Sequence, residues 1–539
     1  MTLFPTLQQF SFDFSDPFFD LGGWQVALQV ITFENVYGLD AHLTDVSNDG
    51  GRRTVTARGL TRAGGQQTSD GQAWLRASPT PDGLELVAGA EHSEKIRCLK
   101  LVLRGLQADS IIGRNWEARP VPPAGVALWY PVFRYMPLLH TPLVFLKSSD
   151  RYLYFESLDD RVRAKRFAVY PTGDTLTVEL IHEEAAHEMG TRLETPTWRI
   201  GACDDPEPVV REHCAHIESA YGLRPWEERA DVPAWARQIS LVVTLHGMHW
   251  TGYVFNTYEQ MLRALEWVCE RIQGRRVLAF LPGWEGRYYW QYGDYRPEPL
   301  LGGQEGFRKL AQGARRLGVT LMPMFGANCA NTASPGFERW GEPSVLRSPT
   351  GMVFQGNRPD WDTSRANDPG WQAWLNPGAP AWRTHLLEQV CGLLNEYGLR
   401  AVFFDTQHVW ENDPNYPVYE GLVTLRDGLK QRFPDLLVAG EGWYDALGAV
   451  TPVSQFGTPA RWPEIFGRYC RTFAHLMFGD PSRNSSGVHE AGHTGFIMVP
   501  DAPWWWPTLT VVDGTLERAP EKAEQVIAQA KEYARKYLA

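Results

Sequence analysis

Residues 401–443 read AVFFDTQHVWENDPNYPVYEGLVTLRDGLKQRFPDLLVAGEGW, and this segment carries the clearest signal for the architecture. Two apolar runs, Ala401–Phe404 and Leu436–Ala439, enclose a segment with a helical pattern. A strand, a helix and a second strand in this order predict a parallel β-α-β unit. An acid follows each predicted strand: Asp405 follows the first and Glu441 the second.

The same alternation of apolar runs and amphipathic segments extends from about residue 238 to the end of the chain. The other predicted strands are Ile239–His246, Val277–Leu281, Val319–Phe325, Val450–Gln455, Phe496–Val499 and Leu509–Val512. The predicted helices are Tyr258–Ile272, Gly306–Leu317, Trp382–Tyr397, Tyr419–Phe433, Pro463–Phe478 and Pro520–Leu538. Roughly eight such repeats in about 300 residues predict a closed (β/α)8 TIM barrel. We place this α/β domain at residues 233–539.

The first part of the chain, residues 1–232, has a different pattern of apolar residues and is predicted to form an N-terminal β-sandwich domain. Short alternating runs there are separated by turn residues, a pattern typical of antiparallel strands packed in two layers. The runs are Trp24–Phe33, Arg53–Leu60, Ala73–Ala77, Leu84–Ala88, Ile96–Leu103, Tyr152–Glu156, Arg166–Tyr170 and Leu176–His182. A helix is expected near Pro206–Ala220, before the connector to the barrel.

Composition excludes several classes of partner. The chain of 539 residues carries a formal net charge of -11, which disfavours nucleic acid and anionic membranes as partners. The seven cysteines are scattered without a CxxC pair, which indicates reduced thiols. The segment Met1–Asp20 lacks the pattern of a signal peptide, so we expect a cytoplasmic protein. Composition says nothing about the oligomeric state.

Chemistry in a barrel of this kind takes place at the carboxyl ends of the strands. Asp405 and Glu441 end two neighbouring, nearly all-apolar strands, where a carboxylate is poorly solvated. Glycoside hydrolysis needs such a pair: one carboxyl group attacks the sugar or activates water, and the other protonates the leaving oxygen. The alternative for either acid is a structural role, as a helix cap or as the partner of an arginine.

Side chains that follow the other strands are candidates for substrate binding. Loop tryptophans stack on sugar rings, and polar groups bind sugar hydroxyls. The long segment from Asn328 to Pro380 is expected to form a wall of the binding cleft. The candidates are Trp284, Asp294, His246, Asn328, Gln407, His408, Trp443 and Trp361, with Glu285 as a further acid in the same loop as Asp294. No metal or organic cofactor is expected.

One motif suggests a different chemistry. Residues 489–493 match the zinc protease pattern H-E-x-x-H, with His489 and His493 at its ends. That site requires a helix, and the internal Gly492 disfavours one by about 1 kcal/mol. We therefore expect a loop near the barrel mouth. The pair His246 and His249 raises the alternative of a metal-dependent hydrolase, but the fifth strand offers no histidine to complete such a site.

The motifs resemble those of the retaining α-glycosidases, and are most similar to the endo-α-N-acetylgalactosaminidase type and its barrel relatives. The resemblance is carried by Phe403–Gln407 and by Gly440–Trp443, and it extends to Trp284–Tyr295 and to Leu143–Arg166. It implies that Asp405 is the nucleophile and Glu441 the acid/base. In α-galactosidase-type barrels the acid is instead an aspartate after the sixth strand, and we find no suitable aspartate there.

The resemblance implies a retaining hydrolase of α-linked galactosamine, N-acetylgalactosamine or galactose-type glycans. Three alternatives stay open: an exo-enzyme of the α-glucosidase or α-galactosidase type, a metal-dependent hydrolase that uses His246, His249, His489 or His493, and a non-catalytic sugar-binding protein on a barrel scaffold. The sugar, its linkage and endo or exo action depend on loop shapes that the sequence does not give.

Overall fold

The structure is a computed structural model, and it describes residues 14–15, 18–21, 24–49, 51–113, 117–131, 139–149, 151–249, 251–287, 289–354, 371–456, 466–474 and 498–538. The chain divides into two compact units, Met1–Leu223 and Arg224–Ala539. Each unit is described by itself.

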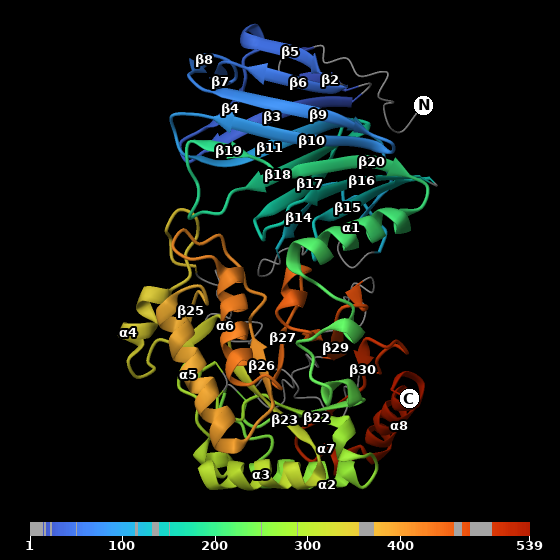
Figure 1. The fold of residues 1–539 in the computed structure, drawn as a ribbon, viewed down its shortest axis with the longest axis vertical. Coiled ribbons are helices and arrows are strands. Elements are labelled where there is room, and N and C mark those ends of the chain that lie inside the picture. Colours follow the sequence, from blue (N-terminus) through green and yellow to red (C-terminus); the bar gives the residue numbers. More distant parts are fainter. Residues whose placement is uncertain are drawn as a thin grey trace. The chain divides into compact units, whose positions relative to one another are not determined.

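The N-terminal unit contains two antiparallel sheets (Figure 1). The first comprises β1 (Phe14–Ser15), β2 (Phe18–Leu21), β3 (Trp24–Thr32), β4 (Val36–Leu39), β7 (Leu60–Arg62), β8 (Gln67–Ser69), β11 (Ile96–Leu106), β14 (Val126–Tyr130), β17 (Lys165–Thr172) and β18 (Thr175–Glu183). The second comprises β5 (Thr44–Asp49), β6 (Arg52–Ala57), β9 (Gln72–Thr80), β10 (Gly83–Glu91), β12 (Ser110–Ile112), β13 (Arg119–Pro120), β15 (Leu143–Ser148), β16 (Arg151–Leu158), β19 (Arg192–Glu194) and β20 (Thr197–Cys203).

Alternating apolar residues build the core of this unit. In β11, Leu101 lies opposite Leu28 of β3 and Leu180 of β18, so that buried side chains meet across the sheet. The two sheets contact each other where the ring of Phe167 packs edge-on against Trp198 at 5.5 Å, both fully buried. Helix α1 (Pro206–Tyr221) follows the last strand.

The C-terminal unit contains one sheet of nine strands, and every neighbouring pair in it is parallel. In sheet order these are β30 (Trp505–Trp506), β29 (Arg471–Ala474), β28 (Val453–Phe456), β27 (Leu437–Glu441), β26 (Ala401–Asp405), β23 (Thr320–Gly326), β22 (Val277–Leu281), β21 (Leu241–Leu245) and β31 (Thr508–Val511). The strands at the two ends of this order, β30 and β31, are separated along the chain only by Pro507. The sheet is therefore nearly closed on itself.

Helices surround this sheet, and its strands are accordingly apolar on both faces (Figure 1). The long helices are α2 (Tyr258–Cys269), α3 (Gly303–Leu317), α5 (Pro380–Tyr397), α6 (Val418–Arg432) and α8 (Pro520–Tyr537), and the short ones are α4 (Phe337–Trp340) and α7 (Thr515–Arg518). Two short strands, β24 (Cys329–Asn331) and β25 (Gln372–Trp374), pair outside the main sheet. Both lie in the long segment from Asn328 to Pro380, which was expected to form a wall of the binding cleft.

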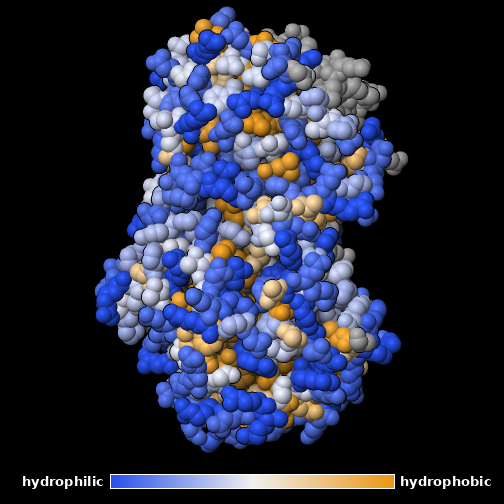
Figure 2. Space-filling view, viewed as in Figure 1, coloured by the Kyte–Doolittle hydropathy of each residue, from blue (hydrophilic) through white to orange (hydrophobic). Residues whose placement is uncertain are grey.

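Single turns of 3-10 helix connect several of these elements. They are η2 (Ala41–Leu43), η3 (Trp226–Glu228), η4 (Ala236–Gln238), η5 (Gly274–Arg276), η6 (Pro299–Leu301), η7 (Glu342–Ser344) and η8 (Ala446–Ala449). The face in Figure 2 is mainly hydrophilic, with small separate hydrophobic patches. Among the described helices, none has the length and apolar character needed to cross a bilayer.

The mixed α/β architecture predicted from the sequence, with antiparallel sheets before a parallel sheet, is confirmed. Two element predictions are wrong. Residues 471–474, expected within a helix, form the parallel strand β29. Residues 498–499, expected in a strand, belong to no element. All four residues of β29 are buried, but its sequence begins with Arg471 and Thr472, so a segment this short shows no periodicity that would predict a strand.

Candidate active site

Asp405 and Glu441 lie side by side at the carboxyl end of the parallel sheet. Asp405 is the last residue of β26 and Glu441 the last of β27, and the register of the two strands pairs Phe404 with Gly440. Because the strands are parallel and in register, the two acids project from the same edge. Asp405 is 7% exposed, so one carboxyl group is held largely out of water.

Hydrogen bonds join the two acids and fix their surroundings. The hydroxyl of Tyr292 donates to Oδ2 of Asp405 at 2.7 Å, and Asp405 also shares a side-chain hydrogen bond with Glu441. Oε2 of Glu441 accepts from the backbone N–H of Thr406 at 3.1 Å. Thr406 has a φ of 61°, a left-handed conformation that a non-glycine residue adopts at a cost. This turn directs its N–H toward Glu441.

The two carboxyl groups titrate together. Burial, and then the charge of Glu441, raise the pKa of Asp405 well above its usual value. The hydrogen bond from Tyr292 and the nearby His408 act in the opposite direction. A pair coupled in this way holds one proton in common over a range of pH, which is the charge state that acid–base chemistry by two carboxyl groups needs.

His408 lies beside this pair: its Nδ1 is 3.5 Å from Oε2 of Glu441 and 3.2 Å from the Glu441 carbonyl oxygen. Gln407 is buried and donates to Thr451 at 2.9 Å. A Cβ atom at Gly440 would lie 2.1 Å from the Gln407 side chain, so only glycine fits there. The Gln407 side chain therefore packs directly against Gly440 of β27, the strand that carries Glu441.

Asn328 is fully buried, and its side-chain amide donates to the carbonyl of Val409 at 2.8 Å. It joins the segment after β23 to the segment after β26. His246 is also fully buried, and its ring packs at a tilt against that of Phe255, with 4.8 Å between the ring centroids. Asp294 forms an ion pair with Arg296. None of these three contacts involves Asp405 or Glu441.

The tryptophans expected to stack on sugars occupy the core instead. Trp284 is 0% exposed, packs on Phe307 and Phe325, and donates to the carbonyl of Met324. Trp443 is 1% exposed and packs on Phe466 at 4.3 Å. Both rings are enclosed because neighbouring elements cover them, so neither offers a face to a ligand. Trp361 lies outside the described residues.

Tyr292 and Glu285 are the site residues that the sequence reasoning missed or ranked too low. Both lie in the segment after β22, and both are buried near Asp405. The available signal was the number of tyrosines among apolar neighbours in this segment, because a buried tyrosine hydroxyl needs a polar partner.

Metal-binding clusters are absent from the described part of the chain, where no group of three or more His, Cys, Asp or Glu side chains could hold an ion. His249 is buried, which lowers its pKa to about 4, and its Nδ1 lies 2.8 Å from the Thr251 hydroxyl. His489 and His493 lie outside the described residues.

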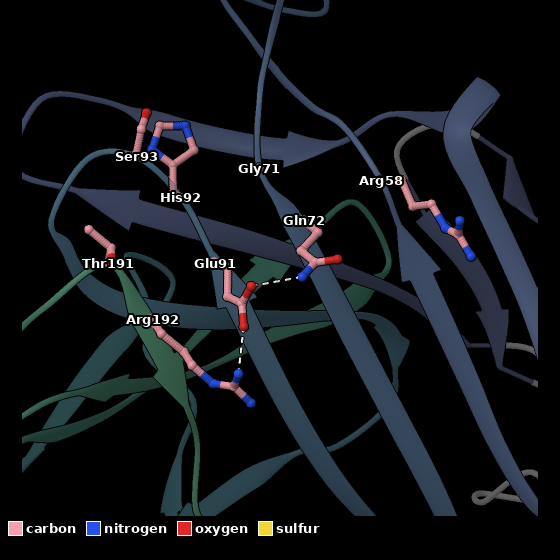
Figure 3. Close-up of a pocket in the computed structure, with 8 residues that line it drawn as sticks. All are labelled: Arg58, Gly71, Gln72, Glu91, His92, Ser93, Thr191 and Arg192. Carbon is pink, nitrogen blue, oxygen red and sulfur yellow. Dashed lines mark hydrogen bonds and ion pairs between the residues drawn. The ribbon is translucent and has the colours of Figure 1, made fainter.

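A pocket in the N-terminal unit offers a second location, but the acid that lines it, Glu91, already bonds to two neighbouring side chains (Figure 3). Glu91 accepts from Gln72 at 2.8 Å and from Arg192 at 2.6 Å, and His92 bonds to Ser69 at 2.9 Å. The pocket lacks the adjacent, coupled acids found at the end of the parallel sheet. The pair Asp405 and Glu441 is therefore the better candidate for chemistry.

Comparisons with known proteins agree on the fold. No family model and no curated protein matches this sequence. Among solved structures, the α-N-acetylgalactosaminidase NagBb from Bifidobacterium bifidum, in complex with GalNAc, superposes with a TM-score of 0.67 at 13% identity, over 97% of this chain and 92% of that one. The GH36 α-galactosidase AgaA from Geobacillus stearothermophilus has a TM-score of 0.51 at 13% identity, over 96% of this chain and 76% of that one.

A third solved structure, the galactosidase domain of an α-galactosidase–sucrose kinase, has a TM-score of 0.51 at 14% identity, over 94% of this chain and 74% of that one. These structural homologues are glycoside hydrolases. The resemblance inferred from the motifs around Asp405 and Glu441 is thus confirmed at the level of the fold.

Proposed function

We propose that this protein is a retaining glycoside hydrolase of α-linked galactose-type glycans, including those of galactosamine and N-acetylgalactosamine. The observation that carries the proposal is the coupled carboxyl pair, Asp405 and Glu441, at the ends of adjacent parallel strands. Support comes from the shared fold with an α-N-acetylgalactosaminidase and with α-galactosidases. We class the two units as a β-sandwich and a (β/α)8 barrel.

The roles of the two acids follow from the resemblance to retaining α-glycosidases around Asp405 and Glu441. Tyr292 donates to Asp405 and so favours its charged form, against burial and Glu441, which raise its pKa overall. We assign the nucleophilic role to Asp405 and the acid/base role to Glu441, as that resemblance implies. Glu441 protonates the glycosidic oxygen while Asp405 attacks the anomeric carbon, and a glycosyl-enzyme ester forms as the leaving alcohol departs.

Hydrolysis of the ester completes the cycle. Glu441, now ionised, takes a proton from water, the resulting hydroxyl attacks the anomeric carbon, and Asp405 is released as the carboxylate. Two inversions give net retention. In a retaining glycosidase about 5–5.5 Å separates the two carboxyl groups. Since Asp405 and Glu441 share a hydrogen bond, a sugar that binds between them has to part the two side chains.

A panel of aryl α-glycosides tests the proposal. The wild type should hydrolyse galactose-type members, and proton NMR should show the α-anomer as the first product. Asp405→Asn should lower kcat by about 10³-fold or more, because no nucleophile is left. Glu305→Gln on the exposed face of α3 is the matched control and should leave kcat unchanged. A first product with the β-configuration, or an active Asp405→Asn, would contradict the assignment.

Glu441→Gln gives a second, sharper test. A leaving group of low pKa needs little protonation, so this variant should still form the glycosyl-enzyme from a dinitrophenyl glycoside and then accumulate it. With an alkyl leaving group its kcat/KM should fall by about 10²-fold or more. Mass spectrometry of the trapped intermediate identifies the nucleophile. Equal losses with both leaving groups would show that Glu441 is not the acid.

A further inference from the structure

Glu285 is a buried acid whose carboxyl group no other described side chain satisfies. It lies four residues after β22, at the same end of the parallel sheet as Asp405 and Glu441. It is 2% exposed, and in the described chain neither of its carboxyl oxygens has a hydrogen-bond partner on another residue. A buried polar group left in this state destabilises the fold. Its presence therefore calls for a role.

The surroundings of Glu285 are acidic. The negative charges of Asp405 and Glu298 disfavour the ionised form of Glu285, and among the described groups no cation favours it. Burial, followed by these two acids, raises the pKa of Glu285 well above its usual value. These effects favour its protonated form, which has one O–H to donate and one oxygen to accept.

The hydroxyl groups near Glu285 are committed elsewhere. The nearby hydroxyls are those of Tyr258, Tyr292 and Tyr295, and a charge on Glu285 raises the pKa of each. The Tyr258 hydroxyl donates to the Trp284 carbonyl at 2.6 Å, that of Tyr292 donates to Asp405, and that of Tyr295 accepts from the N–H of Gly326 at 2.8 Å. Within the described residues, the donor and the acceptor of Glu285 are thus left without a protein partner.

We propose that Glu285 is a third carboxyl group of this site, which acts as the neutral acid and binds a polar substituent of the sugar held by Asp405 and Glu441. This inference rests on the proposed function. A neutral acid suits an uncharged sugar, because its O–H and its carbonyl pair with a substituent that both donates and accepts. It also adds no second negative charge beside Asp405, which has to ionise to act as the nucleophile.

Two substitutions separate this role from the alternatives. Glu285→Gln keeps a donor and an acceptor, so kcat/KM should stay within about threefold of the wild type. Glu285→Leu removes both, so kcat/KM should fall by about tenfold or more. The same leucine should leave the melting temperature equal or higher, because it replaces an unsatisfied polar group. Glu305→Gln, on the exposed face of α3, is the control and should change neither kcat/KM nor the melting temperature.

The pH dependence supplies a readout that a structural role would not move. The wild type should lose sugar affinity at high pH as Glu285 ionises among Asp405, Glu298 and the three tyrosines. Glu285→Gln should abolish this loss. A leucine variant with unchanged kcat/KM, or a glutamine variant as impaired as the leucine variant, overturns the proposal.

Calorimetry with free galactose and N-acetylgalactosamine keeps this proposal distinct from the proposed function, because it needs no turnover. A wild type that hydrolyses no glycoside, yet binds either sugar about tenfold more tightly than Glu285→Leu does, contradicts the hydrolase and supports the role of Glu285. The opposite result is a wild type that hydrolyses glycosides but binds neither sugar more tightly than Glu285→Leu does. That result would support the hydrolase and overturn the role of Glu285.

Discussion

The hydrogen bond from Tyr292 to Asp405 favours the charged form of an acid whose surroundings otherwise raise its pKa. Asp405 is buried and close to Glu441, and both effects favour its protonated form. The Tyr292 hydroxyl, 2.7 Å from Oδ2, is the contact that most directly favours the anion. A tyrosine fully buried in the segment after β22 thus acts on a residue of β26 that lies two strands away in the sheet.

Tyr292→Phe should therefore raise the pKa of Asp405. Because the nucleophile works as the anion, the acidic limb of kcat/KM against pH should move to higher pH, and kcat/KM at neutral pH should fall by about tenfold. The measurement is a pH–rate profile with an aryl α-glycoside.

Tyr295→Phe is the matched control for this substitution, since that hydroxyl bonds to backbone groups, those of Gly326 and Gly293. It should lower thermal stability and leave the acidic limb in place. An acidic limb that stays fixed in Tyr292→Phe would show that this hydroxyl does not set the ionisation of Asp405.

Strands could be predicted from the sequence where charged or turn-forming residues mark both ends of the apolar run. Strand β22 occupies Val277–Leu281 as predicted, because charged residues precede it and a proline follows it. Strand β29 was missed because Arg471–Ala474 shows neither a period nor a turn signal, and only pairing with β28 defines it. Local pattern specifies an element when its ends are marked, and tertiary contacts specify the rest.

The same distinction explains the candidate site. The two acids could be found because their positions at strand ends follow from sequence order alone. The burial of Trp284 could not be found, because the rings that enclose it, Phe307 and Phe325, come from later elements of the chain. A tryptophan after a strand looks the same in sequence whether it faces a cleft or the core.

In the N-terminal unit, helix α1 is joined to β16 by a buried hydrogen bond to the carboxyl group of Glu156, which makes a testable contribution to stability. Glu156 is 0% exposed and bonds to His213 at 2.6 Å and to Arg199 at 2.5 Å. Burial alone would raise the pKa of Glu156, but these two partners outweigh it and lower the pKa below its usual value. The carboxylate therefore stabilises the fold above the unfolded-state pKa, and this contribution is lost as the pH falls through the folded-state pKa.

Glu156→Gln should lower the free energy of unfolding at pH 7 by about 3 kcal/mol, because it leaves a buried charge without its partner. The deficit should shrink as the pH falls below about 4, where the wild-type carboxylate takes up a proton. Urea titrations at both pH values measure this difference.

Glu212→Gln provides the comparison for Glu156→Gln, since Glu212 pairs with the same Arg199 but its side chain is 63% exposed. It should cost about 0.5 kcal/mol or less. A deficit in Glu156→Gln that does not change with pH would contradict the ionised state of Glu156.

Across the whole molecule, all seven cysteines are free thiols. Cys203 and Cys269 are half-buried, and the other five are buried. Burial raises the pKa of Cys203 to about 11 and also raises that of Cys269. Native protein treated with iodoacetamide should therefore gain label slowly, first at Cys203 and Cys269, and the denatured protein should gain seven labels, as counted by mass spectrometry. Rapid native labelling of a buried thiol, or fewer than seven labels after denaturation, would contradict this arrangement.

The position of Pro507 between β30 and β31 constrains how this protein can be synthesised and folded. A single short stretch near the end of the chain supplies the partners of both β29 and β21, and the carbonyl of Pro507 itself accepts from Val242 at 2.9 Å. During translation, β21 therefore keeps one side unpaired until more than 260 further residues have left the ribosome. Such non-local pairing slows folding. We expect nascent chains that end before residue 505 to depend on chaperones.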